Sequence, residues 1–481
     1  MQPRKFLGWA LAILFHAAAA QGQDSSGTGK MLTLQECVDI AVKNNILVET
    51  NEIARQTAQV NRNQAIDYLL PSITGNAQQA VYMGKSVNPV TYSYVNQTIG
   101  TGSYGLNANL LLFAGLQIQN SIKQYGYSFD ASKLDLQQQK DNITLNVLVD
   151  YLQVLSNTDV LSQTREQAAT DVRQLQRLEQ QNSQGALSVP SDMYNLRGQV
   201  AADQGAIVTA ISNLESSKIT LFQVLNIPYD RRVQLESITP NPNIAQYGSD
   251  PDSIFQKALQ ILPGIKSVDL KVKASQRALA VARGVYFPTL SVFGGLSSNY
   301  SSAALNSIGG AITNQPTSNF VTVSGSTYYV YTPVQNFTST KVPFGQQVSN
   351  DLNNSLGLSL NVTLLNGLRA RNQVRQAKIN LLSTEYQANN TKLTLQQTVE
   401  LAYQNMLAAY GQFKSYLDQV AAYTESFRIT EIRFNEGVIN SDPYVLAKNN
   451  LDRAAISLTA AKYAYIFRTK ILDYYQGTLI W

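Results

Sequence analysis

Residues 368–436 read LRARNQVRQAKINLLSTEYQANNTKLTLQQTVELAYQNMLAAYGQFKSYLDQVAAYTESFRITEIRFNE, a stretch without proline whose only interior glycine is Gly411. Apolar or small residues recur in it at every seventh position: Val374, Leu381, Ala388, Leu395, Ala402, Ala409, Tyr416 and Tyr423. A seven-residue repeat keeps one seam of a helix facing a partner and implies left-handed supercoiling. At about 1.5 Å per residue this helix is roughly 100 Å long. Because helical stability comes mostly from a packed face, we expect it to pack against other helices along its whole length.

The first residues have the pattern of a secretory signal, which we predict over residues 1–20. Arg4 and Lys5 form a charged start, an apolar core follows, and small alanines mark a cleavage site. An uncleaved anchor is the alternative. No later run is long and apolar enough to predict a membrane helix. Removing Arg4 and Lys5 changes the 37 Lys and Arg to 35, against 32 Asp and Glu. This near-balance argues against a nucleic-acid-binding protein.

The residue inventory excludes several kinds of chemistry. The only histidine, His16, lies in the predicted signal, and Cys37 is the only cysteine. The mature chain therefore lacks the residues for Ser-His-Asp or Cys-His catalysis and for a histidine or cysteine metal cluster. We identify no catalytic, cofactor-binding or metal-binding residue and predict that the protein is not an enzyme. Residues 33–36 match a capping box, which places Cys37 in a hydrophobic staple.

The chain contains an internal duplication. Pro71 and Pro288 are 217 positions apart, whereas Gly115 and Gly367, like Gly185 and Gly437, are 252 apart. The change of offset (252 − 217 = 35) makes the second loop, residues 301–350, longer than the first. A duplicated core with a variable loop is typical of a solvent-exposed loop.

Each half then has the same predicted order of a helix, two strands, a very long helix and a final helix. In the first repeat, residues 21–226, these are a helix over 33–70, a strand pair within 72–113, a long helix over 116–184 and a helix over 191–226. Residues 227–252 form a linker or equatorial segment. In the second repeat, residues 253–477, they are a helix ending near Pro288, a strand pair within 289–365, a long helix over 368–436 and a helix over 442–477.

The predicted strands are about ten residues long and alternate apolar with polar residues, as outer-membrane strands do. In the strand before Gly115, for example, Leu106 and Leu110 alternate with Asn107 and Asn109. A sheet in lipid must close, and the smallest barrels have about eight strands. Four strands therefore require two or three copies. A soluble sheet packed on helices is the alternative.

The helix-to-strand connections fix the orientation of this arrangement. Short turns at Pro71, Gly115, Pro288 and Gly367 put every helix on one side of the sheet. We expect this side to be the periplasm and the two loops to face outside.

These features together resemble the outer-membrane factor family of TolC-type efflux channels, from Leu32 to about Gly477. The likeness rests on the duplicated layout, the prolines before the strands, and two helix-tip turns. One tip is residues 433–437, RFNEG, followed by Ser441-Asp442; the other is residues 184–187, QGAL, followed by Ser191-Asp192. The resemblance implies an α+β fold, with a trimeric outer-membrane β-barrel of four strands per protomer, continuous with a long periplasmic α-helical barrel.

The resemblance also implies partners and sites. The implied partners are the other copies of the chain in a homotrimer, outer-membrane lipid, a periplasmic adaptor at the helix tips and an inner-membrane pump. No nucleic acid and no cofactor are expected. The expected adaptor-docking residues are Gly185, Ser191, Gly437 and Ser441. Asp192, Asp442 and Arg433 are the expected aperture residues, and a trimer would place six of these carboxylates there, favouring cations. The alternative is that both aspartates cap helices. Tyr444 and Ala447 stand where some members carry gate acids.

The function expected from this reading is a passive exit duct of a tripartite efflux or type I secretion system. A non-conducting, periplasm-spanning structural or adhesive coiled coil is the alternative. Residues 100–105 match a dinucleotide-binding glycine pattern, but they precede a strand instead of opening a helix, so we discount that pattern.

Overall fold

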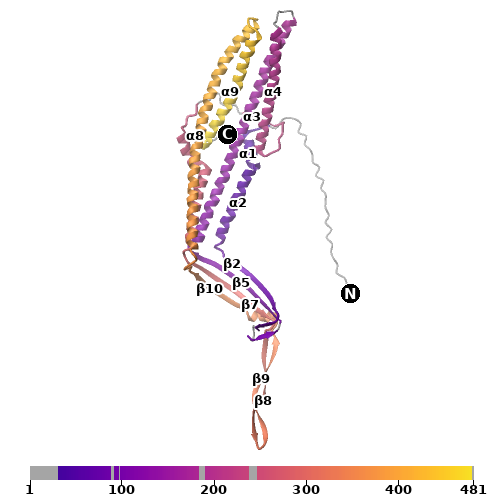
Figure 1. The fold of residues 1–481 in the computed structure, drawn as a ribbon, viewed down its shortest axis with the longest axis vertical. Helices are drawn as coiled ribbons and strands as arrows, with labels where there is room; N and C mark the ends of the chain where they lie inside the picture. Colours follow the sequence, from indigo (N-terminus) through magenta and orange to yellow (C-terminus); the bar gives the residue numbers. More distant parts are fainter. Residues whose placement is uncertain (1–30, 88–91, 97, 184–189, 238–245, 479–481) are drawn as a thin grey trace, which may run out of the picture.

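A computed structural model of the chain describes residues 31–87, 92–96, 98–183, 190–237 and 246–478. The molecule is elongated: helices fill one end, a four-stranded sheet lies in the middle, and a two-stranded hairpin extends from the far end (Figure 1). Among the described residues, no helix has the length and apolar character needed to cross a membrane.

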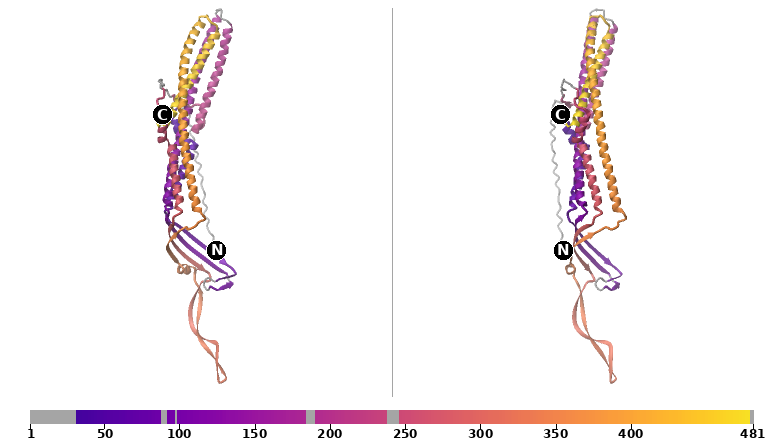
Figure 2. Two further views of the ribbon diagram at one scale, coloured as in Figure 1. Left: turned by 60° about the vertical axis from the view of Figure 1, so that its left-hand side comes forward. Right: turned by 90° about the vertical axis from the view of Figure 1, so that its left-hand side faces the viewer.

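Two helices of 67 residues each dominate the helical end, α3 (Gln117–Ser183) and α8 (Arg369–Asn435). None of the seven-residue repeat positions in α8 is fully exposed: Ala388 and Ala409 are buried and the others are half-buried. Two helices of 36 residues follow them, α4 (Pro190–Leu225) and α9 (Ser441–Gln476). These four run side by side, α3 with α4 and α8 with α9 (Figure 2).

The helix that precedes each strand pair is broken, and the prediction of one continuous helix was wrong in both repeats. The first consists of α1 (Leu34–Asn44) and α2 (Ile46–Asp67), the second of α5 (Pro251–Ile261) and α6 (Pro263–Gly284). Asn45 is extended, with ψ 124°, and its side chain caps α2. Leu262 is extended, with ψ 129°, because it precedes a proline. The two breaks are also 217 positions apart (262 − 45 = 217), so the break itself is duplicated.

The four-stranded sheet is antiparallel throughout and joins the two repeats. Its strands, in spatial order, are β10 (Asn353–Asn361), β7 (Thr289–Ser301), β5 (Ile99–Ala114) and β2 (Ser72–Tyr82). The central pair β5–β7 connects one repeat to the other. β2 and β10 are the edge strands, with one neighbour each among the described strands.

The cross-strand register gives the sheet one mostly polar face, with Ala80, Leu111 and Phe293 as exceptions, and one mostly apolar face, with Gln79, Ser298 and Asn354 as exceptions. Asn107 lies opposite Gly295, and Leu106 lies opposite Leu296. The polar face contains Ser72, Thr74, Asn76, Gln78, Thr101, Ser103, Asn107, Asn109, Ser297, Asn299, Asn353, Ser355, Ser359 and Asn361. The apolar face contains Ile73, Ala77, Val81, Tyr104, Leu106, Ala108, Leu110, Leu290, Val292, Leu296, Leu356, Leu358 and Leu360.

The alternating sequence pattern and the observed strand pairing differ at two places, where we expected regular alternation to continue. Leu112 lies in a bulge between Leu111 and Phe113 and is opposite no residue of β7. Leu352, Val362 and Leu364 fall outside β10, which ends at Asn361. The alternating pattern of the sequence therefore continues beyond the residues that form backbone pairs.

The predicted loop over residues 301–350 is instead a long hairpin and a short helix. The hairpin consists of β8 (Leu305–Val323) and β9 (Ser326–Lys341), and α7 (Phe344–Asn350) follows it. Ser324 and Gly325 form a two-residue turn with φ of 53° and 82°. Positive φ at both positions is the geometry that matches the twist of paired strands. A smaller hairpin of β3 (Lys85–Val87) and β4 (Tyr94–Asn96) lies in the first repeat.

The main core lies where α1, α3 and α4 meet the equatorial segment. Cys37 is fully buried there, behind the capping box of Thr33 and Glu36. A two-residue parallel pair, β1 (Met31–Leu32) with β6 (Gln234–Leu235), fixes the segment. The buried hydroxyl of Tyr151 lies 3.1 Å from the Leu32 carbonyl and 2.7 Å from that of Glu236. This contact anchors the segment to α3.

Candidate functional site at the helix tips

The turn between α8 and α9 is closed by a glycine in the left-handed conformation. Gly437 has φ +68°. The Val438 N–H donates to the Arg433 carbonyl at 2.8 Å, and the Gly437 N–H donates to the Phe434 carbonyl at 3.0 Å. This is the helix-ending arrangement that favours glycine, because other residues are strained at positive φ. Gly185, the expected counterpart at the other tip, lies outside the described residues.

Asp192 is the third residue of α4 and bonds to the helix of the other repeat. Its side chain is 8% exposed, and its carboxylate accepts a hydrogen bond from the Ser441 N–H at 2.9 Å. The N-cap residue of α9, Asn440, supplies no side-chain hydrogen bond. Asp192 therefore takes the place of the missing cap, and its charge lies at the positive end of α9.

Asp442 occupies a different environment from Asp192. Its side chain is exposed and accepts a hydrogen bond from the Asn195 amide at 2.8 Å. The same amide lies 3.1 Å from the hydroxyl of Ser441, which is itself fully buried. The starts of α4 and α9 are thus joined by two side chains of α4, those of Asp192 and Asn195. Ser191 is exposed beside them.

Arg433 contributes through its backbone carbonyl at the turn. Its side chain is exposed and makes no ion pair among the described residues. Two α3 residues that the sequence did not single out hold the end of α8 instead. Arg177 donates to the Asn435 carbonyl at 3.2 Å, and Gln174 donates to the Asn435 side chain at 3.0 Å. No sequence signal marked them, since the contacts join residues about 260 positions apart.

A small aromatic core stabilises the tips. The Phe434 and Tyr444 rings stack at 4.8 Å, and Leu178 and Leu196 from the first repeat pack beside them. Tyr444 is fully buried, and burial raises the pKa of its hydroxyl. Tyr444 therefore belongs to the core in this conformation and does not line an opening.

Below this core lies a buried ionic cluster formed by α3, α4 and α9. Lys448 is 2% exposed, and its ammonium lies 3.0 Å from Asp171 and 2.5 Å from Asp452. Burial, followed by the neighbouring Asp203 carboxyl group, raises the pKa of Asp171, although Lys448 opposes the shift. Burial acts against the charge on Lys448, yet Asp452 and Asp171 outweigh it and raise its pKa. The attraction of Lys448 therefore offsets only part of the cost of burying the charge on Asp171 between the three helices.

No group of His, Cys, Asp or Glu side chains within the described ranges is arranged to hold a metal ion. The lysine at the centre of the ionic cluster takes the position that a cation would need. The chemistry available at the tips is therefore reversible hydrogen bonding and ion pairing between helices.

At the other end of the helices, glycines allow the two repeats to cross closely. Gly115 has φ +59°, and a Cβ there would lie 2.3 Å from the Gly284 carbonyl oxygen. Gly367 has φ +64° with open space around it. Pro71 and Pro288 directly precede β2 and β7. All four predicted turn residues thus lie where helices meet the sheet, and Gly284 is the close-contact residue that the sequence analysis missed.

Comparison with known proteins identifies the relatives of this arrangement. Residues 254–470 match the family described as outer membrane efflux protein. The chain is 23% identical over 394 residues to the outer membrane protein TolC of Escherichia coli (strain K12). The aligned region covers 78% of this chain and 71% of that protein. TolC of Salmonella enteritidis is 22% identical over 348 residues, covering 71% and 62%.

Solved structures of outer membrane channels share the fold. The Campylobacter jejuni CmeC outer membrane channel aligns with a TM-score of 0.70 at 17% identity, covering 92% of this chain and 86% of that one. The outer membrane protein VceC of Vibrio cholerae aligns with a TM-score of 0.70 at 11% identity, covering 92% and 96%. The predicted resemblance to TolC-type outer-membrane factors and the α+β fold are confirmed.

Proposed function

We propose that this chain, whose residues 254–470 match the outer membrane efflux protein family, is one subunit of an outer-membrane efflux channel with its helices in the periplasm. It is a transport protein and not an enzyme. The observation that carries the proposal is the four-stranded sheet, which is apolar on one face, polar on the other and open at both edges. Such a sheet can separate lipid, on its apolar face, from water, on its polar face.

The open edges require other copies of the chain. In lipid, the backbone groups of β2 and β10 must find partners, and only closure of the sheet satisfies all of them. Three copies supply twelve strands (3 × 4), a number that outer-membrane barrels accommodate. The polar face then lines a passage that continues between the long helices. We propose a homotrimer that acts as a passive duct in a tripartite efflux or type I secretion system.

The helix tips are the proposed meeting point with a periplasmic adaptor, which links the channel to an inner-membrane pump. Gly437 and Ser191 are exposed there, whereas Ser441 is buried. We therefore assign adaptor contact to the exposed pair and give Ser441 a role in joining α4 to α9. Asp442, and not the buried Asp192, is the carboxylate available to a passing ion.

Single-channel recording in a planar bilayer tests the proposal. Purified trimers should give a reproducible unit conductance that prefers cations. Trimers that insert but conduct no ions would instead support the non-conducting structural protein. The matched control is the same preparation after heat dissociation, which should give no conductance.

A further inference from the structure

The hairpin formed by β8 and β9 projects beyond the sheet along the long axis of the molecule (Figure 1). Its strands have 19 and 16 residues, longer than the 13 and 9 residues of the β7 and β10 strands that flank it in sequence. A two-stranded hairpin is at best marginally stable by itself in water. This hairpin therefore needs a stabilising partner.

Both faces of the hairpin carry large exposed apolar side chains. Tyr329 lies opposite Phe320 on one face, while Tyr328 lies opposite Val321 on the other. Their exposed fractions lie between 53% and 61%. Ile308, Ile312, Tyr331 and Phe337 add to this surface, with exposed fractions between 59% and 66%. Such a density of exposed large apolar side chains, set among uncharged polar residues, indicates an interaction site.

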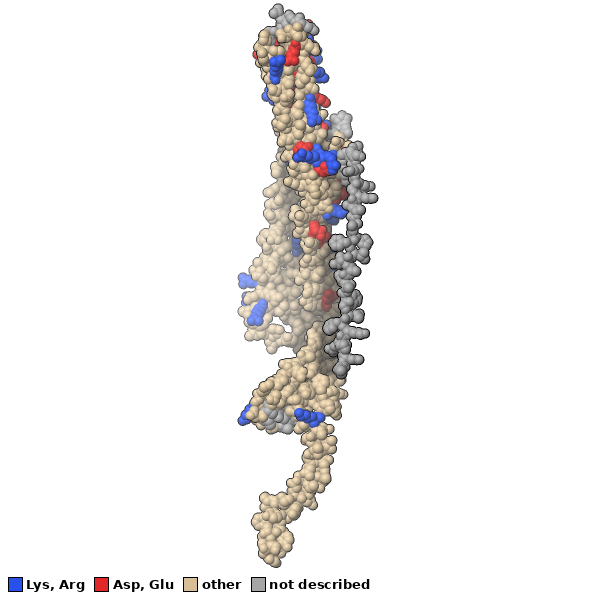
Figure 3. Space-filling model, turned by 90° about the vertical axis from the view of Figure 1, so that its right-hand side faces the viewer, with Lys and Arg blue, Asp and Glu red and all other residues tan. Residues whose placement is uncertain are grey.

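The hairpin surface is also free of charge. Residues 284–340 contain no Asp, Glu, Lys, Arg or His. Figure 3 shows the charged residues of the visible face over the helices and near the sheet, with none along the hairpin. A surface that binds anionic headgroups needs Lys or Arg. Identical uncharged surfaces, by contrast, can approach one another without like-charge repulsion.

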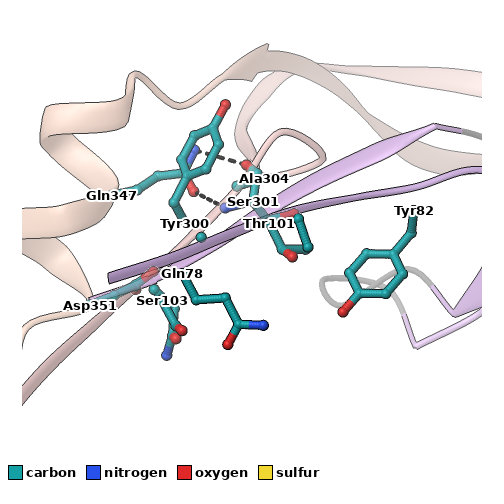
Figure 4. A pocket seen from close by; sticks show the side chains of 12 residues that line it. Gln78, Tyr82, Thr101, Ser103, Tyr300, Ser301, Ala304, Gln347 and Asp351 are labelled. Atoms are coloured by element: carbon teal, nitrogen blue, oxygen red, sulfur yellow. Dashed lines mark hydrogen bonds between the residues drawn. The ribbon is translucent and has the colours of Figure 1, made fainter. Parts of the chain in front are cut away.

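The root of the hairpin is fixed to the sheet by α7. Gln347 is 5% exposed; its side chain accepts from the Ser301 N–H at 2.8 Å and donates to the Ser301 carbonyl at 3.0 Å (Figure 4). It also donates to the Val342 carbonyl at 2.8 Å. Ser302 exchanges two hydrogen bonds with the Gly100 backbone, each of 2.8 Å. These bonds tie both ends of the hairpin to β7 and β5.

Aromatic packing strengthens this root. The Phe344 ring meets Tyr104 at 5.8 Å and Tyr300 at 5.3 Å, both edge-on. A cavity of about 470 Å³ remains beside it, lined by Gln78, Tyr82, Ser103, Asn299 and Asp351 among others. The direction of the hairpin is therefore set by the sheet, so neighbouring sheets determine which hairpins meet.

We infer that the three hairpins of a trimer pack against one another through their uncharged faces, with the exposed apolar side chains at the contact, and form a shared β-structure beyond the barrel. This inference rests on the proposed trimer, because closure of the sheet by rotational symmetry places three identical hairpins at one end of one axis. The occupant of each hairpin surface is thus a second copy of this chain. Packing also covers the open strand edges that would otherwise favour aggregation.

Photo-crosslinking in cells tests the inference directly. Tyr329→p-benzoylphenylalanine and Phe337→p-benzoylphenylalanine should each give covalent dimers and trimers of this chain after irradiation. Leu296→p-benzoylphenylalanine is the matched control, since Leu296 is exposed on the apolar face of a central strand and should crosslink to no other copy. Adducts of the hairpin positions only to lipid or to another protein would overturn the inference.

Two further measurements separate this inference from the proposed function. Light scattering in detergent on the same samples reports whether trimers exist; monomers would refute the proposed channel itself. Replacing residues 306–340 by Gly-Ser-Gly should leave trimers that still conduct, but should lower the temperature at which they dissociate. Trimers of the deleted protein that dissociate at the wild-type temperature would overturn the inference while leaving the channel intact.

Discussion

Replacing Asp192 by alanine should loosen the periplasmic end of the channel. The Asp192 carboxylate accepts a hydrogen bond of 2.9 Å from the Ser441 N–H, and both residues are buried. This hydrogen bond replaces the missing side-chain cap of α9. A hydrogen bond to a charged group contributes about 1.5–3 kcal/mol. Since about 1.4 kcal/mol is a factor of ten, Asp192→Ala should shift each protomer roughly tenfold or more toward separated tips.

The assay is the fraction of time that single trimers spend in high-conductance states in a planar bilayer. Asp192→Asn keeps an acceptor oxygen but loses the charge, and neutral hydrogen bonds contribute only about 0.5–1.5 kcal/mol. We therefore expect the open fraction to rise in the order wild type, Asp192→Asn, Asp192→Ala. Asp418→Ala, on an exposed position of α8, is the control. Equal open fractions for all four proteins would refute the reasoning that this bond holds the tips together.

Three other perturbations follow from the structure. Asp442→Ala should weaken cation preference, and reversal potentials in a salt gradient that match the wild type would contradict this. Because the pKa of Asp171 is raised in the folded state, the folded protein holds its proton more tightly, so stability should fall as pH rises from about 4 toward neutrality. Asp171→Asn should reduce the fall of the thermal midpoint as the pH rises. An unchanged pH dependence of the thermal midpoint would contradict this prediction. Gly115→Ala should abolish trimer assembly, because its Cβ would lie 2.3 Å from a carbonyl oxygen. Gly411→Ala, at a position with open space around it, should instead raise the thermal midpoint slightly. Gel filtration in detergent measures trimer assembly and calorimetry measures the thermal midpoint of the two variants.

Much of the fold was readable because its signals are local. The seven-residue repeat predicted a seam in α8, of which Ala388 and Ala409 are buried and the other members are half-buried. Prolines 71 and 288 stand where a helix gives way to a strand, because proline lacks a backbone donor and disfavours helix at the residue before it. Such rules need only neighbouring residues, so the sequence alone suffices.

The β8–β9 hairpin has strand and turn signals in its sequence that the prediction of a loop did not use. The run of Tyr328 to Tyr331 combines aromatic and β-branched residues, and Ser324-Gly325 suits a tight turn. Residues 301–350, which are rich in Ser and Thr, were predicted to form a loop, yet the structure forms β8 and β9 there. Strand propensity was therefore the better guide than polarity.

The tip contacts could not be found from one sequence. Asp192 looked like the cap of its own helix, but its partner Ser441 is 249 positions away. Lys448 and Asp171 were the subject of no prediction, because nothing local shows that three helices bury them together. Long-range pairing depends on how the two repeats pack. The duplication indicates that the repeats pack together, but it does not indicate which residues pair across them.

The most direct test of the account is an electron cryo-microscopy map of the mature protein purified in detergent. The account predicts three chains around one axis, with β2 of each copy paired to β10 of the next and the polar face turned toward a continuous water-filled passage. A map in which β2 and β10 keep open edges, or in which the apolar face lines the interior, would contradict it.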